Sequence, residues 1–272
     1  MDIYFLLVII LLLLIALAAV LAIQKLARAN RELKRLDDAK SEFLSLASHQ
    51  LRTPLTITKG YISMLLEGNF GQMSETIKDT LDKLYLANER LIGLVENLLN
   101  ISRIEAGRIE FKLRPVDLAV VAKSLVDDFQ NKAKAKKIKL QFYADSNINK
   151  VVADEEKIKE VISNLLDNAV KYTAQGEIIV NLHQEGQSIV FACQDTGCGL
   201  EPADLPKLFN KFGRGQNAGQ IEGSGLGLYY ARAVIENMGG RVWAESPGKN
   251  QGSKFCFSLP LFDKNKTKKI KK

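Results

Sequence analysis

Hydrophobic side chains are concentrated first at the amino-terminal end of the chain. Residues 3–23 contain no charged side chain. This length of helix is enough to cross the hydrocarbon core of a bilayer, which is about 30 Å thick. A cleaved signal peptide is the alternative, because Ala16-Leu17-Ala18 resembles a cleavage site. However, Asp2 precedes the run where a signal peptide carries basic residues, and the run is long for a signal. We therefore predict a transmembrane helix over residues 3–23.

Basic residues follow this segment directly. Residues 24–40 carry six Lys or Arg against three Asp or Glu. The positive-inside rule then places everything after residue 24 in the cytoplasm, with residues 24–40 as a helical juxtamembrane linker. Because only one or two residues precede the apolar run, we expect no extracellular sensor domain. The prediction is a single-pass, membrane-anchored protein.

The pattern of the next segment predicts two helices. Residues 24–68 have a helix-forming composition interrupted only by Pro54, a loop follows at 68–74, and a second helix is predicted over Glu75–Glu105. Its apolar positions follow a 4–3 spacing, with Asn88 in the one missed slot: Ile77, Leu81, Leu84, Leu91, Val95 and Leu98. Further apolar residues widen this stripe: Leu86, Ile92, Leu94 and Leu99. Two helices cannot cover so much apolar surface, whereas four can, so residues 41–108 predict a homodimeric, antiparallel four-helix bundle.

After Gly107 the pattern changes to short β-rich stretches alternating with helices. The strands are expected at Lys139–Tyr143, Glu177–Leu182, Ser188–Cys193 and Lys254–Leu259. The helices are expected at Leu118–Lys134, Asp154–Tyr172 and Gly227–Met238. This order predicts an α/β sandwich over residues 113–262, with helices on one face of a mixed sheet, and an α+β class for the whole chain.

The net charge of +7 first suggests a nucleic-acid-binding protein, but its distribution argues against one. Residues 24–40 carry +3 and the lysine-rich tail at 263–272, expected to be disordered, carries +5, so the remaining chain has −1. A near-neutral body excludes a basic nucleic-acid-binding fold. The three cysteines are odd in number and lack metal-type spacing, which indicates reduced thiols in a cytosolic domain.

One histidine is a candidate nucleophile. His49 lies on the first helix of the predicted bundle, and an exposed imidazole with a free ring nitrogen can attack phosphorus or carbonyl centres. A helical histidine is more often structural or merely exposed. Pro54, five residues later, frees the carbonyl of Gln50 from its helical hydrogen bond and bends the helix, which favours a functional interpretation.

A polar helical face provides the second candidate. Asn164, Asn168 and Lys171 are spaced by four and three residues and share one face, while apolar neighbours supply the opposite side. A solvated polar face is the simple alternative. Oxygen ligands next to a lysine suit a Mg²⁺–phosphate group.

Two glycine-rich segments complete the set: Asp195-Thr196-Gly197-Cys198-Gly199-Leu200 and Gly223-Ser224-Gly225-Leu226-Gly227-Leu228. The first follows a predicted strand and the second leads into a helix, where glycines let a phosphate approach backbone N–H groups. Each segment alone is also compatible with an ordinary turn. The Gly-Lys-Ser/Thr ending of a phosphate-loop NTPase does not occur, and a dinucleotide fold would place its glycines after the first strand.

Taken together and in this order, the motifs resemble those of the sensor histidine kinases of two-component systems over residues 38–262. SHQLRTPLT (48–56) is similar to the phosphoacceptor box and NLLDNAVKYT (164–173) to the asparagine box. DTGCGL (195–200) and GSGLGL (223–228) look like the two glycine boxes, with LFNKFGR (208–214) as the phenylalanine-containing box between them. The resemblance implies a dimerisation and phosphoacceptor hairpin followed by a GHKL-type ATP-binding domain, in the plasma membrane of a prokaryote.

The resemblance also implies roles for individual residues. ATP and Mg²⁺ would be the cofactors, Asp195 would accept a hydrogen bond from the adenine amino group, and Asn168 would ligate the metal. The other residues implied in nucleotide binding are Asn164, Lys171, Tyr172, Gly197, Gly199, Phe209, Phe212, Arg214, Gly223, Gly225, Leu226 and Gly227. Residues 213–222 would form a mobile lid. His49 would attack the γ-phosphate and pass the phosphoryl group to an aspartate of a response regulator.

One position departs from the family pattern. The residue after the histidine is usually acidic, whereas here it is Gln50, and an amide cannot act as a base. Thr53 keeps the polar position that the family uses to orient water in its phosphatase activity. A pseudokinase or phosphatase-biased scaffold of the same fold is therefore the alternative function. A chaperone- or mismatch-repair-type ATPase is disfavoured, since those proteins lack a histidine-bearing bundle and have a catalytic glutamate at the position of Asn164.

Overall fold

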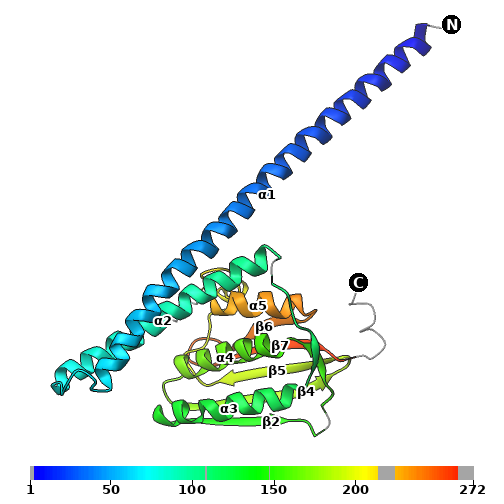
Figure 1. Ribbon diagram of the computed structural model, residues 1–272. Helices are drawn as coiled ribbons and strands as arrows, with labels where there is room; N and C mark the ends of the chain where they lie inside the picture. Colours follow the sequence, from blue (N-terminus) through cyan, green and yellow to red (C-terminus); the bar gives the residue numbers. More distant parts are fainter. Residues whose placement is uncertain (1–2, 108, 147, 214–223, 263–272) are drawn as a thin grey trace.

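A computed structural model describes residues 3–107, 109–146, 148–213 and 224–262. The chain forms a very long helix, a helical hairpin and an α/β domain that lies beside the hairpin (Figure 1). Arg214, Gly223, most of the predicted lid and the lysine-rich tail at 263–272 fall outside the described residues.

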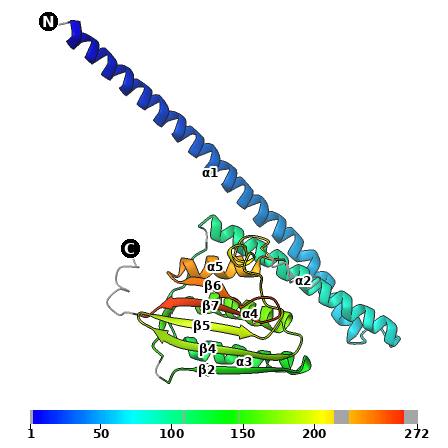
Figure 2. The ribbon, with the colours of Figure 1, turned by 180° about the vertical axis from the view of Figure 1, so that it is seen from behind.

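Helix α1 (Ile3–Leu66) runs from the amino terminus through Pro54 without ending. Its first half projects away from the rest of the molecule in both views (Figures 1 and 2). Within the described residues, one helical segment is long and apolar enough to cross a membrane, Leu12–Ala39, with a mean hydropathy of 1.9. This segment overlaps the predicted span only from residue 12 and continues into the basic linker. Its leucines are uncovered: Leu12, Leu13 and Leu14 are 60%, 64% and 58% exposed.

Helix α2 (Glu75–Glu105) starts and ends at the predicted residues. The side chain of Ser74 accepts a hydrogen bond from the backbone N–H of Ile77 at 3.4 Å, which caps the first turn. At the other end Ala106 is the C-cap and Gly107 has a φ of 63°, the left-handed conformation that commonly terminates a helix. Local capping chemistry therefore sets both ends.

Two ion pairs fix the antiparallel register of the hairpin. Lys59 Nζ lies 2.6 Å from Glu89 Oε1, and Arg52 Nη2 lies 3.5 Å from Glu96 Oε1. Asn88, the residue that interrupts the apolar spacing, is buried and donates its side-chain N–H to the carbonyl oxygen of Leu55 at 2.8 Å.

The apolar stripe of α2 is only partly covered within one chain. Ile77, Leu84 and Leu91 remain about half exposed. A second hairpin is not part of the structure, so the four-helix bundle stays a prediction.

The α/β domain confirms the predicted α+β class. Its main sheet has the order β2-β4-β5-β7-β6, with β2 and β4 parallel and the other neighbours antiparallel. These strands are β2 (Ile138–Ala144), β4 (Gly176–Glu185), β5 (Ser188–Asp195), β6 (Arg241–Glu245) and β7 (Ser253–Pro260). A small antiparallel pair joins β1 (Arg114–Val116) to β3 (Val151–Ala153), and a 3₁₀ turn, η1, spans Leu205–Lys207.

Three helices cover one face of this sheet: α3 (Leu118–Ala135), α4 (Glu155–Tyr172) and α5 (Gly227–Asn237). Figure 1 looks onto the helices and Figure 2 onto the opposite, uncovered face. Alternate residues of β4 point at the helices, so Ile178, Val180 and Leu182 are at most 2% exposed. The rings of Phe191 and Phe257 stack across β5 and β7 with centroids 4.9 Å apart. The resulting core holds α4 and α5 on the sheet.

Strands β1, β3 and β6 were not expected from the sequence. The first two have three residues each, which is too short to show an alternating pattern. Strand β6 (RVWAE) lies at the sheet edge and has no fully buried residue, so its pattern resembles that of a loop.

Candidate functional site

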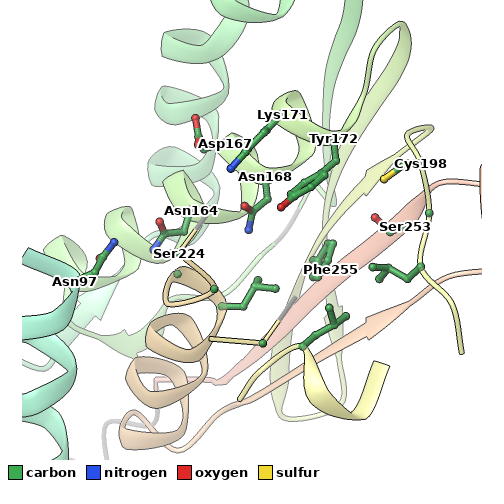
Figure 3. A pocket seen from close by; sticks show the side chains of 17 residues that line it. Asn97, Asn164, Asp167, Asn168, Lys171, Tyr172, Cys198, Ser224, Ser253 and Phe255 are labelled. Atoms are coloured by element: carbon green, nitrogen blue, oxygen red, sulfur yellow. The ribbon is translucent and has the colours of Figure 1, made fainter. Parts of the chain in front are cut away.

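A cavity of about 210 Å³ lies between α4, the loop after β5, the start of α5 and the near edge of α2 (Figure 3). Of the predicted binding residues, seven line it: Asn164, Asn168, Lys171, Tyr172, Gly199, Gly225 and Gly227. These residues come from three motifs spread over positions 164–227, and the fold brings them together at one pocket.

Helix α4 supplies the polar wall of the cavity. Its first turn is capped by Asp154, whose carboxylate accepts from the backbone N–H of Lys157 at 3.2 Å. The opposite, apolar side is buried, including Leu165 and Ala169 at 1% and 2% exposure. Because the buried face fixes the helix rotation, Asn164 and Asn168 are held facing the cavity.

The other end of the cavity is built on a buried carboxylate. Asp195 is 3% exposed and does not itself line the cavity, but Ser253 does. Ser253 Oγ donates to Asp195 Oδ2 at 2.6 Å, and the backbone N–H of Gly197 donates to Oδ1 at 2.8 Å. Burial raises the pKa of the Asp195 carboxyl above its usual value, while these hydrogen bonds act to lower it. A carboxylate has about four lone-pair sites, so acceptor capacity remains for a ligand.

The glycines around Asp195 are demanded by the packing of the loop itself. A Cβ atom at Gly197 would lie 2.4 Å from the carbonyl oxygen of Tyr172, and one at Gly199 would lie 2.1 Å from that of Gly248. Gly199 also has a φ of 65°. The resemblance implied these glycines in nucleotide binding; the structure adds that the loop could not close with side chains there.

The remaining predicted binding residues do not line the cavity. Phe209 and Leu226 are buried in the core at 8% and 5% exposure, whereas Phe212 is 65% exposed. Phe212 has a φ of 60°, and a Cβ at Gly225 would lie 2.6 Å from its backbone carbonyl carbon. The contact of Phe212 with the glycine loop is therefore made through its backbone. Roles for Phe209, Phe212 and Leu226 in binding stay predictions.

The candidate phosphoacceptor lies on α1, outside the cavity. His49, Gln50 and Thr53 are exposed, and Thr53 Oγ1 donates to the carbonyl oxygen of His49 at 3.4 Å. In the two hairpin ion pairs, Arg52 and Lys59 are seven residues apart on α1, and Glu89 and Glu96 are seven residues apart on α2. Extending these pairings puts His49 near the level of residues 94–99 of α2, since the ion pairs give Leu99 and the Asn88–Leu55 hydrogen bond gives Leu94.

Several lining residues escaped the sequence reasoning. Asn97 comes from α2, Asp167 lies within the asparagine box, Ser224 precedes α5, and Ser253 and Phe255 come from β7. Asp167 could have been found by counting every polar residue of the asparagine box. Asn97 and Ser253 carry no local sequence signal.

The residues present fit the nucleotide and metal implied by the motifs. Among the described residues, no group of three or more His, Cys, Asp or Glu side chains is arranged to hold a metal ion. Nucleotide-bound Mg²⁺ does not require such a group, since it commonly takes one or two protein oxygens together with phosphates and water. The side-chain oxygen of Asn168, beside Asn164 and Lys171, is a donor set of that kind.

Two protein-family models match parts of the chain. Residues 39–107 match the His Kinase A (phospho-acceptor) domain, and residues 153–263 match the histidine kinase-, DNA gyrase B- and HSP90-like ATPase. The chain belongs to the sensor histidine kinases of two-component systems. The resemblance in the motifs is thereby confirmed.

Relatives of this histidine kinase have much longer chains. It is 35% identical over 229 residues to the circadian input-output histidine kinase CikA of Synechococcus elongatus, covering 82% of this chain and 30% of that one. It is 31% identical over 243 residues to the sensor histidine kinase GacS of Pseudomonas protegens, covering 86% and 26%. The crystal structure of full-length ShkA in complex with AMPPNP is similar at 28% identity with a TM-score of 0.67, covering 81% of this chain and 46% of ShkA. The chain thus spans about a third or less of CikA and GacS and just under half of ShkA.

Proposed function

We propose that this chain is a protein-histidine kinase that transfers the γ-phosphoryl group of ATP to His49 and then to an aspartate of a response regulator. The observation that carries the proposal is a polar cavity, walled by Asn164, Asn168 and Lys171, against a hairpin that bears an exposed histidine near the level of the cavity. The AMPPNP bound by the relative ShkA supports ATP as the ligand.

In this proposal the two ends of the cavity hold different parts of ATP. Asp195, backed by Ser253 and Gly197, accepts a hydrogen bond from the adenine amino group. Lys171 and Tyr172 face the phosphates and ribose, and Gly225 and Gly227 lie against the phosphates. Gly223, expected to act with them, lies outside the described residues. Asn168 ligates Mg²⁺ with Asn164 alongside, and the metal supplies positive charge that offsets the charge developing on the phosphates.

The chemical step is an in-line displacement. A neutral ring nitrogen of His49 forms the N–P bond, the bond between phosphorus and the β,γ-bridging oxygen breaks, and ADP leaves with that electron pair. The imidazole proton passes to a base, which Gln50 cannot be. Because His49 does not line the cavity, the ATP-binding domain must move around the hairpin before transfer.

The assembly that we propose has the predicted boundaries. Residues 3–23 anchor the protein in the plasma membrane, 24–40 link the anchor to the phosphoacceptor domain at 41–108, and 113–262 bind ATP. An apolar helix with uncovered leucines at residues 12–14 is unfavourable in water and supports the anchor. The half-exposed Ile77, Leu84 and Leu91 support a homodimeric bundle, because a second hairpin would cover them.

The test is incubation of the full chain with γ-³²P-ATP. The expected product is an acid-labile, alkali-stable label on the protein that His49→Ala abolishes, while the variant keeps its ATP affinity. A wild-type chain that binds ATP but gains no such label would contradict the kinase proposal.

Gln50 favours one second candidate, a phosphatase-biased scaffold of the same fold, since it lacks the usual base while Thr53 retains the position that orients water. That function predicts no label on His49 and faster loss of phosphate from a phosphorylated response regulator. Thr53→Ala would abolish the faster loss.

A further inference from the structure

The ATP cavity is not built from the ATP-binding domain alone. Asn97, on α2 of the phosphoacceptor hairpin, lines the cavity together with Asn164 and Ser224. Figure 3 shows its side chain at the end of the cavity opposite Cys198 and Ser253. Since Ser253 hydrogen-bonds the proposed adenine acceptor Asp195, the end at Asn97 is the end for the terminal phosphates.

The surroundings of Asn97 suit an anion. The cavity opens there into a wider groove of about 870 Å³ between α2, α3 and α4, and the two share Asn97, Asp167, Lys171 and Ser224. The groove adds Arg90, Lys132 and Lys136. Lys132 pairs with Asp167, and Lys136 Nζ donates to the carbonyl oxygen of Val170 at 2.9 Å. The lining therefore carries four cationic side chains against the two carboxylates of Glu89 and Asp167.

Asn97 also lies close to the phosphoacceptor along the hairpin. The ion pairs put His49 level with Leu99 and the Asn88–Leu55 hydrogen bond puts it level with Leu94, so His49 lies within about three residues, or about 5 Å of helix rise, of the level of Asn97. The phosphate end of the cavity and His49 thus share one level of the hairpin, on different helices.

We propose that Asn97 is a nucleotide-binding residue supplied by the hairpin, whose side-chain N–H donates to the terminal phosphate of ATP and which therefore distinguishes ATP from ADP. This inference rests on the proposed function, because it needs ATP in the cavity. It means that α2 senses the γ-phosphate: the ATP-loaded domain is held on the hairpin before it moves for transfer, and the ADP-loaded domain loses that contact.

The test compares AMPPNP and ADP binding by calorimetry, with Mg²⁺, to the full chain in detergent micelles. A hydrogen bond to a charged group corresponds to about tenfold or more in affinity. Asn97→Ala should therefore weaken AMPPNP binding by about tenfold or more and leave ADP binding within about twofold. The isosteric Asn97→Asp should weaken AMPPNP binding further, because a carboxylate repels the phosphate.

Asn100→Ala is the matched control, since Asn100 is half-buried on the same helix and lines neither cavity. It should leave both affinities unchanged. The ratio of the AMPPNP and ADP affinities within one variant is insensitive to partial unfolding, because unfolding would weaken the binding of both nucleotides by the same factor.

A second measurement follows α2 directly. Hydrogen exchange at backbone amides of residues 93–99 should slow with AMPPNP and not with ADP, and Asn97→Ala should remove the difference. If Asn97→Ala lost affinity for AMPPNP and ADP equally, or lost affinity for neither, the proposed role of Asn97 would be overturned. A wild-type chain that binds neither nucleotide would instead contradict the proposed function itself.

Discussion

Ser253 Oγ donates a hydrogen bond to Asp195 Oδ2 at 2.6 Å, between two buried side chains that are partners in the ladder of β5 and β7. This bond stabilises the ionised carboxylate behind the cavity wall at Ser253, whereas burial favours its protonated form. An ionised carboxylate that is buried without a ligand lowers the stability of the ligand-free protein.

Asp195→Asn should stabilise the nucleotide-free chain at neutral pH while weakening ATP binding by about tenfold or more. Burial raises the pKa of Asp195 in the folded state above the usual value of 3.8. For such a group the stabilising contribution is present at low pH and is lost as pH rises through the folded-state pKa. The gain in melting temperature over wild type should therefore be larger at pH 7.5 than at pH 4, and a gain that grows toward acid pH would contradict the argument.

Binding of adenosine, which lacks phosphates, should weaken on acidification at a pH above the usual aspartic acid value. Protonation of Asp195 turns the proposed acceptor into a donor toward the adenine amino group. Ser253→Ala removes a hydrogen bond that lowers the pKa of Asp195, so the midpoint should move to higher pH. Fluorescence titrations at a series of pH values would measure both midpoints, and identical midpoints in the two proteins would argue against this role of Ser253.

Gly199→Ala should destabilise the ATP-binding domain more than Gly186→Ala. Both glycines have a left-handed backbone, with φ of 65° and 59°, so both variants should lose about 1–2 kcal/mol from that conformation. Only at Gly199 would the new Cβ lie 2.1 Å from a backbone oxygen, which should cost about 1–3 kcal/mol more. Urea unfolding of the two variants would compare them, and equal losses would mean that the loop accommodates the methyl group.

Cys198 should be the first thiol to react with N-ethylmaleimide, and saturating ATP should slow the reaction by about tenfold, since a bound ligand blocks access. Cys198 is half-buried and lines the cavity, whereas Cys193 and Cys256 are buried. Burial raises the pKa of the Cys198 thiol, so the labelling is best followed at alkaline pH. Mass spectrometry would locate the adduct, with Cys198→Ala as the control. Labelling of Cys198 at the same rate with and without ATP would place the nucleotide elsewhere.

Gln50→Glu should raise the rate of autophosphorylation by about tenfold or more, because a carboxylate next to His49 can accept the imidazole proton. Gln50→Ala is the control and should not exceed the wild-type rate. The measurement is the initial rate of ³²P transfer to His49. An unchanged or lower rate in Gln50→Glu would mean that another group already serves as the base.

The local sequence predicted much of the hairpin and the sandwich, since capping and periodicity act over a few residues. Ser74 and Gly107 mark the ends of α2, alternation marks β4, and a continuous apolar run marks β5. The 4–3 spacing also places Asn88 at a position where an apolar residue is expected, and the local sequence does not explain this exception. The reason is a contact across the hairpin, from Asn88 to the carbonyl of Leu55, 33 residues away.

The sequence by itself determined the family and the residues that we propose carry the chemistry, because the histidine, asparagine and glycine motifs are short segments whose residue types and spacing can be read directly. Only the tertiary structure decided that Ser253 supports Asp195 and that Asn97 of the hairpin completes the cavity. Both depend on how a strand pairs and how a helix packs beside a domain remote from it in sequence. Such contacts follow from the fit of whole surfaces, for which a single serine or asparagine leaves no periodic trace.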